Sequence, residues 1–370
     1  MRFVKNGDLK IGMRLAKPVY DKKGVLLYDR DSKLTQQGID SVKNFGLIGL
    51  YILEPAEPLP PMTEEDIEFE RFQMVSVFAI QEELNAIRTS GKAPKMQIIA
   101  SNIIKNYGRL EHKVNFVQSL RSHEDYIYKH ALNVAILCAM ITHVMNVKLD
   151  EQLDTVIAAI VHDVGKLSIS KKIREKEGKY TAAELLEIEN CERSSADMAE
   201  AALASPKIKR MIVQSWKGLY DWKRKKTAPE GKIVMGAKIL MVAETFDTMT
   251  AMNHYQEPSS EVMALRYLMQ HPEIFDKDVV DALVKSVNIL AKGCCVELTN
   301  GDKGLVIQEN EFNILKPVIL CFRDNQIVDL SHNVIYEDME IKDVMKTMDN
   351  RCVMDPKQIS ELDGKGQQDA

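Results

Sequence analysis

The sequence contains few cysteines and no metal-binding cysteine motif. Its six cysteines are scattered over 370 residues, and none forms a C-x-x-C pair. Structural zinc sites and disulfide frameworks both depend on regularly spaced cysteines, so neither is indicated. We therefore expect reduced thiols and a cytoplasmic protein.

Long apolar runs and an excess of positive charge are also missing. No stretch approaches the roughly 18 apolar residues of a membrane span, and no cationic-then-apolar leader opens the chain. The net charge is −5, from 49 Lys and Arg against 54 Asp and Glu, so no global basic field attracts nucleic acid. We expect neither a membrane span nor a nucleic-acid partner.

The remaining composition is that of a folded protein with more than one core. Apolar residues make up 45% and charged residues 28% of the chain. Its 370 residues are more than a single hydrophobic core usually contains. Residues 1–54 predict a small α+β domain, in which short β-like runs at 13–16 and 25–28 flank a turn at 21–24. Closely spaced prolines then predict a linker over residues 55–63.

Residues 64–290 predict a helical domain, because apolar residues recur at spacings of three and four. From 291 the pattern changes, and alternating runs around the tight-turn dipeptide Asn300-Gly301 predict a small antiparallel β domain over residues 291–346. We expect residues 347–370 to be a disordered tail. The predicted fold is thus mainly α, a helical bundle flanked by two small domains.

The most informative feature of the helical region is the adjacent pair His162 and Asp163. This pair ends an apolar run and is followed directly by Gly165 and Lys166. Imidazole and carboxylate both suit divalent metals, and two buried polar side chains need partners. The pair alone is weak evidence, because such dipeptides also occur by chance.

Two further apolar segments supply matching side chains. His130 begins the run HALNVA, and Glu244 ends the run ILMVAE, with Asp247 three residues later on the same helix face. A histidine, a His-Asp pair and an acid therefore stand on three separate apolar helices. Each residue taken alone has an ordinary structural explanation, but the set is much more specific than any member.

These segments resemble the HD superfamily of metal-dependent phosphohydrolases, whose pattern is H…HD…D on a helical bundle. The resemblance is greatest to its HD-GYP branch, bacterial cyclic di-GMP phosphodiesterases, in the segments YIYKHALNVA (126–135), HDVGK (162–166) and GKYTAAE (178–184). It implies metal ligands His130, His162, Asp163 and Glu244. It also implies catalytic roles for Asp163 and Lys166, while Asp247 would orient His130 or a water.

The chain also departs from the branch pattern at functional positions. Cys191 stands where the family has a histidine, Ser215 and Trp216 replace a His-His pair, and no G-Y-P loop is present. The basic run 223–226 replaces that substrate-side loop, and we expect it to be a solvated loop. Cys191 is a candidate substituted ligand, although a lone thiol is more often a small buried hydrophobe.

The resemblance and the departures together lead to a bacterial signalling protein with an eroded catalytic centre. It would hold one divalent ion or none, with iron or manganese expected, and act as a sensor or interaction module toward a signalling partner. A cyclic dinucleotide or another anionic ligand is expected near Lys223–Lys226. The alternatives are an active phosphohydrolase on cyclic di-GMP or another phosphorylated nucleotide, and a structural protein in which the His-Asp pair only packs.

Overall fold

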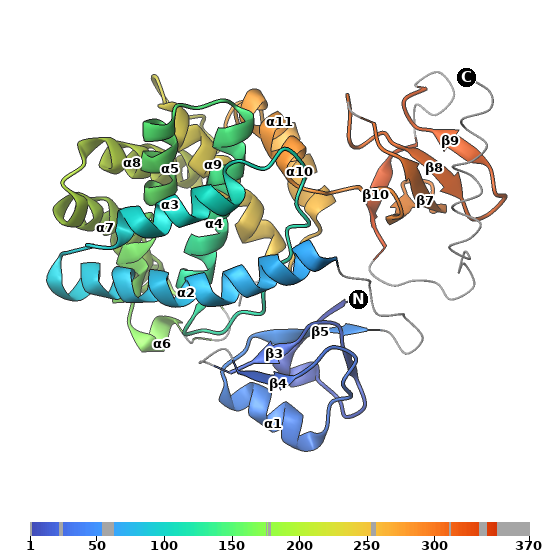
Figure 1. Ribbon diagram of the computed structural model, residues 1–370, viewed down its shortest axis with the longest axis horizontal. Coiled ribbons are helices and arrows are strands. Elements are labelled where there is room, and N and C mark those ends of the chain that lie inside the picture. Colours follow the sequence, from blue (N-terminus) through green and yellow to red (C-terminus); the bar gives the residue numbers. More distant parts are fainter. Residues whose placement is uncertain are drawn as a thin grey trace.

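A computed structural model describes residues 2–21, 25–53, 63–174, 176, 179–252, 257–310, 312–332 and 339–345. It places a helical bundle between a small N-terminal α+β domain and a small C-terminal β domain (Figure 1). The predicted fold class is confirmed. The predicted tail and most of the predicted linker lie outside the described residues, so the domain boundaries stay a prediction.

The N-terminal domain combines two small sheets with one helix. Its elements are β1 (Arg2–Lys5), η1 (Asn6–Asp8), β2 (Arg14–Leu15), β3 (Val19–Tyr20), β4 (Leu26–Tyr28), α1 (Gln36–Asn44) and β5 (Gly49–Leu53). The larger sheet has the order β1-β5-β2, and β3 pairs with β4. The run at 13–16 was expected beside the run at 25–28, and this is wrong. Strand β4 pairs with β3, and Arg14 and Leu15 pair with β5 instead.

The helical domain follows from residue 64 onward. Its elements are α2 (Glu64–Ser90), α3 (Met96–Tyr107), α4 (Tyr126–Val144), α5 (Leu149–Val161), η2 (Val164–Ser168), α6 (Lys171–Arg174), α7 (Ala182–Leu203), α8 (Pro206–Lys225), α9 (Met235–Thr250), α10 (Glu261–Gln270) and α11 (Lys277–Ser286). Thr63 and Thr181 cap α2 and α7 through reciprocal hydrogen bonds with Asp66 and Glu184. These caps explain why both helices begin where they do.

Helix α4 is the centre of the bundle. It contacts α2, α3, α5, α9 and α11, and most of its side chains are buried on every face. By length and composition it would also be apolar enough to cross a membrane, but 83% of that window is buried inside the protein. Its apolar character is therefore that of a core helix.

Helix α8 is longer than the sequence indicated. The run Lys223–Lys225 forms its last turn rather than a loop, and Lys226 ends the helix in the left-handed conformation. No helix-breaking residue intervenes before Pro229, and cations are favoured at a helix C-terminus. Asp221 adds ion pairs to Lys217 and Lys225 one turn away on either side.

The C-terminal domain is a five-stranded antiparallel sheet in the order β10-β6-β7-β8-β9. Its strands are β6 (Cys295–Leu298), β7 (Lys303–Gln308), β8 (Val318–Cys321), β9 (Ile327–Asp329) and β10 (Ile341–Val344). The turn at Asn300-Gly301 joins β6 to β7 as predicted. Buried Val296 and Leu298 continue the apolar core of the helical bundle, so this sheet packs directly onto it.

Gly165 allows α7 to pack closely on η2. A Cβ atom at this position would lie 1.9 Å from the carbonyl oxygen of Cys191 and 2.6 Å from Oγ of Ser194. Its amide donates to Oγ of the buried Ser195 at 2.9 Å. The glycine after the His-Asp pair is therefore required by the approach of another backbone.

We expect Gly165→Ala to lower the free energy of unfolding by about 3 kcal/mol or more, because a backbone oxygen cannot move aside as a flexible side chain can. Urea unfolding of the full chain measures this change. Gly7→Ala is the matched control, since nothing lies within 4 Å of its Cβ position. Equal stability of the two variants would contradict the packing argument.

Candidate metal centre

Four candidate ligands, from two helices and from the turn between α5 and η2, lie close together. His130 lies on α4, His162 directly follows α5, Asp163 directly precedes η2, and Glu244 lies on α9. One ligand atom from each lies within 4.8 Å of all the others. His130 and Glu244, which lie 114 positions apart in the sequence, are therefore neighbours in the fold.

Glu244 is the centre of this cluster. Its Oε2 lies 2.6 Å from Nε2 of His130 and 2.9 Å from Nε2 of His162. Oδ2 of Asp163 lies 3.7 Å from each of the same two nitrogens. Although glutamate is longer than the family's aspartate, its carboxylate does face the His-Asp pair.

The other ring nitrogen of each histidine is held by an acceptor. Nδ1 of His130 lies 2.6 Å from Oδ2 of Asp247, and Nδ1 of His162 lies 2.7 Å from the carbonyl oxygen of Ala159. Each acceptor favours a proton on Nδ1, which leaves Nε2 free to ligate. Metal-binding histidines are typically oriented by such hydrogen bonds, so these residues fit one divalent cation.

Burial and charge oppose each other at these groups. Burial lowers the pKa of His130, but the carboxylates of Glu244 and Asp247 outweigh it and hold that pKa well above its ordinary value. Burial raises the pKa of Glu244, but the two imidazoles hold it well below its usual range. The cluster therefore contains negatively charged carboxylates, and these are stable when buried because positive groups lie beside them.

Asp247 is fully buried and is the most highly coordinated carboxylate of the site. Besides His130, it accepts hydrogen bonds from Arg121 at 2.7 Å, and from Gln118 and Asn133 at 2.9 Å each. Arg121 is also fully buried. Asn133 is on the same face of α4 as His130, three residues on, but nothing in the sequence pointed to Gln118 or Arg121, which lie in an irregular segment.

Lys166 lies beside the cluster rather than in solvent. Its Nζ is 2.8 Å from Oδ2 of Asp163 and 3.2 Å from Oε1 of Glu192. Burial lowers the pKa of Lys166, but Asp163 and Glu192 together hold it well above its ordinary value. Trp216 donates from Nε1 to the other oxygen of Glu192 at 3.3 Å.

The residues that replace the family's further histidines lie in two different places. Trp216 and Ser215 line a cavity of about 80 Å³ together with His162, Asp163 and Glu244. Cys191 instead lines a separate surface depression on α7, with Asn190 and Ser194. It does not belong to the ligand cluster formed by the described residues. Of the basic run, Lys223 reaches the cavity wall.

The comparisons with known proteins agree with this site. The family described as HD domain matches residues 115–279, which contain all four candidate ligands. Residues 115–279 are an HD domain, and their motifs resemble those of the HD-GYP type. The chain is also 24% identical to a cyclic di-GMP phosphodiesterase of Pseudomonas aeruginosa, over 317 residues that cover 79% of this chain and 74% of the relative.

In this HD domain we expect Arg121→Met to lower the free energy of unfolding by about 3–5 kcal/mol, because it leaves the buried carboxylate of Asp247 without its main counter-ion. Urea unfolding followed by circular dichroism measures the loss. The double variant Arg121→Met/Asp247→Leu should recover part of it, since no unpaired charge then remains.

The control for this pair is the ion pair of Lys217 with Asp221 on α8, in which the lysine side chain is 63% exposed and Asp221 keeps a second partner, Lys225. Lys217→Met removes a partner of Asp221 at the surface, where solvent screens the charge, so no measurable change is expected. Equal effects of Arg121→Met and Lys217→Met would contradict the role given to the buried pair.

Proposed function

We propose that this protein is a cytoplasmic signalling protein of the HD-GYP type whose catalytic centre is reduced to one metal site. His130, His162, Asp163 and Glu244 would hold the ion, iron or manganese, and the domain would act as a sensor or interaction module. The observation that carries this proposal is the position of Ser215 and Trp216. They stand where the family has a His-His pair, and they line the cavity beside His162, Asp163 and Glu244.

Metal-dependent hydrolysis of a phosphodiester relies on cations that activate water and neutralise phosphoryl oxygens. In this chain Ser215 and Trp216 line the cavity beside Asp163, where the family has two histidines. The indole of Trp216 cannot ligate a metal, and its Nε1 donates to Glu192 instead. These contacts support a one-metal site rather than a two-metal site.

The dimensions of the site support the same proposal. The cavity beside the four ligands measures about 80 Å³. Pockets that enclose a drug-sized ligand measure about 300 Å³ or more, and a cyclic dinucleotide is at least that large. The stacked rings of Trp216 and Tyr220, with centroids 5.0 Å apart, form one wall of this narrow site.

The alternative is an active phosphohydrolase, and one observation favours it. Lys166 and Lys223 line the same cavity as the candidate ligands, so two cations are available to an anionic substrate. The named activity of the Pseudomonas relative makes cyclic di-GMP the first substrate to test. In this alternative, Asp163 would hold the metal and Lys166 would contact the reacting phosphate.

We expect the purified full chain to bind close to one equivalent of manganese or iron. His130→Ala and Glu244→Ala should each abolish this binding, because each removes one of only four ligands. Elemental analysis after dialysis measures the stoichiometry. Cys191→Ser is the matched control and should retain the metal. Two equivalents per chain, or loss of metal in Cys191→Ser, would contradict the one-metal site.

We expect no turnover of cyclic di-GMP or of bis(p-nitrophenyl) phosphate above the level of Asp163→Ala, with manganese or iron present. Product formation is measured by chromatography for the nucleotide and by absorbance for the phosphodiester. Turnover by the natural sequence that disappears in Asp163→Ala would establish the alternative and overturn the reduced-centre proposal.

A further inference from the structure

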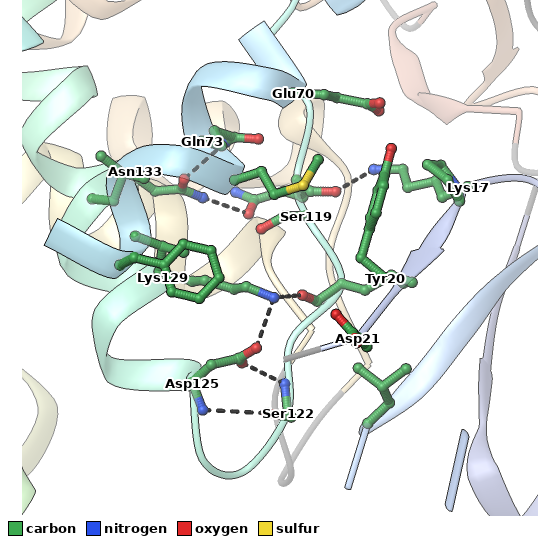
Figure 2. A pocket seen from close by; sticks show the side chains of 18 of the residues that line it. Lys17, Tyr20, Asp21, Glu70, Gln73, Ser119, Ser122, Asp125, Lys129 and Asn133 are labelled. Atoms are coloured by element: carbon green, nitrogen blue, oxygen red, sulfur yellow. Dashed lines mark hydrogen bonds and ion pairs between the residues drawn. The ribbon is translucent and has the colours of Figure 1, made fainter. Parts of the chain in front are cut away.

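A second, larger cavity lies where the N-terminal domain meets the helical domain. It measures about 190 Å³ and contains none of the four candidate metal ligands (Figure 2). Lys17 and Tyr20 line it from the N-terminal domain, Met74 and Val77 from α2, and Ser119 from the segment before α4. Two domains therefore build this cavity jointly.

Backbone contacts fix the walls of the cavity at this junction. The amide of Ile48 donates to the carbonyl oxygen of Arg121 at 3.1 Å, and the amide of His123 donates to that of Gly46 at 3.3 Å. Leu120, which lines the cavity, is buried within the apolar core of the N-terminal domain. The cavity is therefore a property of the folded junction.

The four carboxylates of the lining are already engaged within the protein. Glu70 pairs with Arg30 at 2.8 Å, and Asp125 pairs with Lys129 at 2.7 Å. The other two, Asp21 and Glu124, have partners as well. A cationic ligand would find no uncommitted carboxylate, and an anionic ligand would meet more carboxylates than ammonium groups. The lining therefore suits an uncharged molecule.

Lys17 is the unusual group of this lining, because its amino group is buried without a carboxylate beside it. The residue is 8% exposed, and no carboxylate of the described residues forms an ion pair with it. Its Nζ donates to the backbone carbonyl oxygen of Gln118 and lies 4.6 Å from the centre of the Tyr51 ring. Figure 2 shows this side chain extending from the N-terminal domain toward the helical side of the cavity.

These surroundings favour the uncharged amine of Lys17. Burial lowers the pKa of Lys17 to about 8, although the more distant carboxylates of Glu70 and Glu261 act in the opposite direction, and Arg30 adds to the lowering. A lysine that is desolvated in this way is a nucleophile near neutral pH. The uncharged amine can keep one N–H on Gln118 and still present its lone pair to a bound molecule.

The rest of the lining provides room for an apolar ring next to this amine. Met74, Val77 and Phe78 on α2 and Leu132 on α4 form its apolar part. A dry cavity of about 150 Å³ already accepts a benzene molecule, so 190 Å³ accommodates one ring with a short substituent.

We propose that the junction cavity binds a small uncharged aldehyde with one apolar ring, and that Lys17 condenses with it to a protonated imine. After Nζ has released a proton, it forms a bond to the carbonyl carbon, and the carbonyl oxygen takes up protons and leaves as water. Ammonium and aldehyde thus give iminium and water, with no change in net charge or oxidation state. The iminium nitrogen keeps one N–H for Gln118.

This site is distinct from the metal centre, and the proposal does not rest on the proposed function of that centre. Its test is reductive trapping of the imine. The full chain is incubated at pH 7 with benzaldehyde and sodium cyanoborohydride, which reduces an imine to a stable benzylamine. Peptide mass spectrometry then locates the labelled lysines and follows the rate of labelling at each.

We expect Lys17 to be labelled at least about tenfold faster than Lys95, because burial favours the uncharged amine of Lys17, whereas the Lys95 side chain is 62% exposed. The rate at Lys17 should saturate with benzaldehyde concentration, as binding in a cavity requires, and the rate at Lys95 should rise linearly. With the anionic probe 4-carboxybenzaldehyde, the ratio of labelling at Lys17 to that at Lys95 should be lower.

Variants that leave Lys17 in place locate the site. Met74→Trp and Val77→Phe fill the cavity, and each should lower the rate at Lys17 at least about tenfold without changing the rate at Lys95. Val75→Trp is the matched control on the same helix, because Val75 is 67% exposed and does not line the cavity; it should be labelled as the natural sequence is.

Three results would overturn the proposal. They are equal rates at Lys17 and Lys95 in the natural sequence, an unaltered rate at Lys17 in both cavity variants, and a higher Lys17-to-Lys95 ratio with 4-carboxybenzaldehyde than with benzaldehyde.

Discussion

The buried ion pair between Arg121 and Asp247 is the constraint on which the site depends. Both side chains are fully buried, where isolated charges are very unfavourable. They are tolerated because Asp247 also accepts from His130, Gln118 and Asn133, so its charge is shared among several donors. This one carboxylate thereby fixes the relative positions of α9, α4 and the irregular segment that carries Arg121.

The same interaction ties the N-terminal domain to the candidate metal centre. The segment that supplies Gln118 and Arg121 is held on its other side by backbone hydrogen bonds with Ile48 and Gly46 and by the ammonium of Lys17. A displacement of the small domain would therefore disturb the donors around Asp247 and, through it, the orientation of His130. The accessory domain is consequently part of the support of the site.

At the cluster itself, electrostatics selects what can bind. The carboxylates of Asp163 and Glu244 require positive partners, and two imidazoles, one lysine or a divalent cation can all meet that requirement. Lys166 meets part of it through its ion pair with Asp163, and Glu192 pairs with the same ammonium group. The four ligands fit one cation next to the two imidazoles, and this fit supports the proposed one-metal centre.

The sequence by itself predicted the fold class through helical periodicity, and the resemblance of its motifs to a known family indicated that family and the four candidate ligands, because all of these are local patterns. It did not predict the extra strands β1 and β10 or the pairing of β2 with β5, which depend on partners farther along the chain. Nor did it predict the helical end of α8, which ion pairs within that helix support. The tertiary structure alone decided that Arg121 and Gln118 support His130, that Cys191 lies away from the cluster, and that a cavity forms at the domain junction. These features depend on how separate segments pack together, as where Arg121 meets Asp247 126 residues away, and no local pattern encodes such contacts.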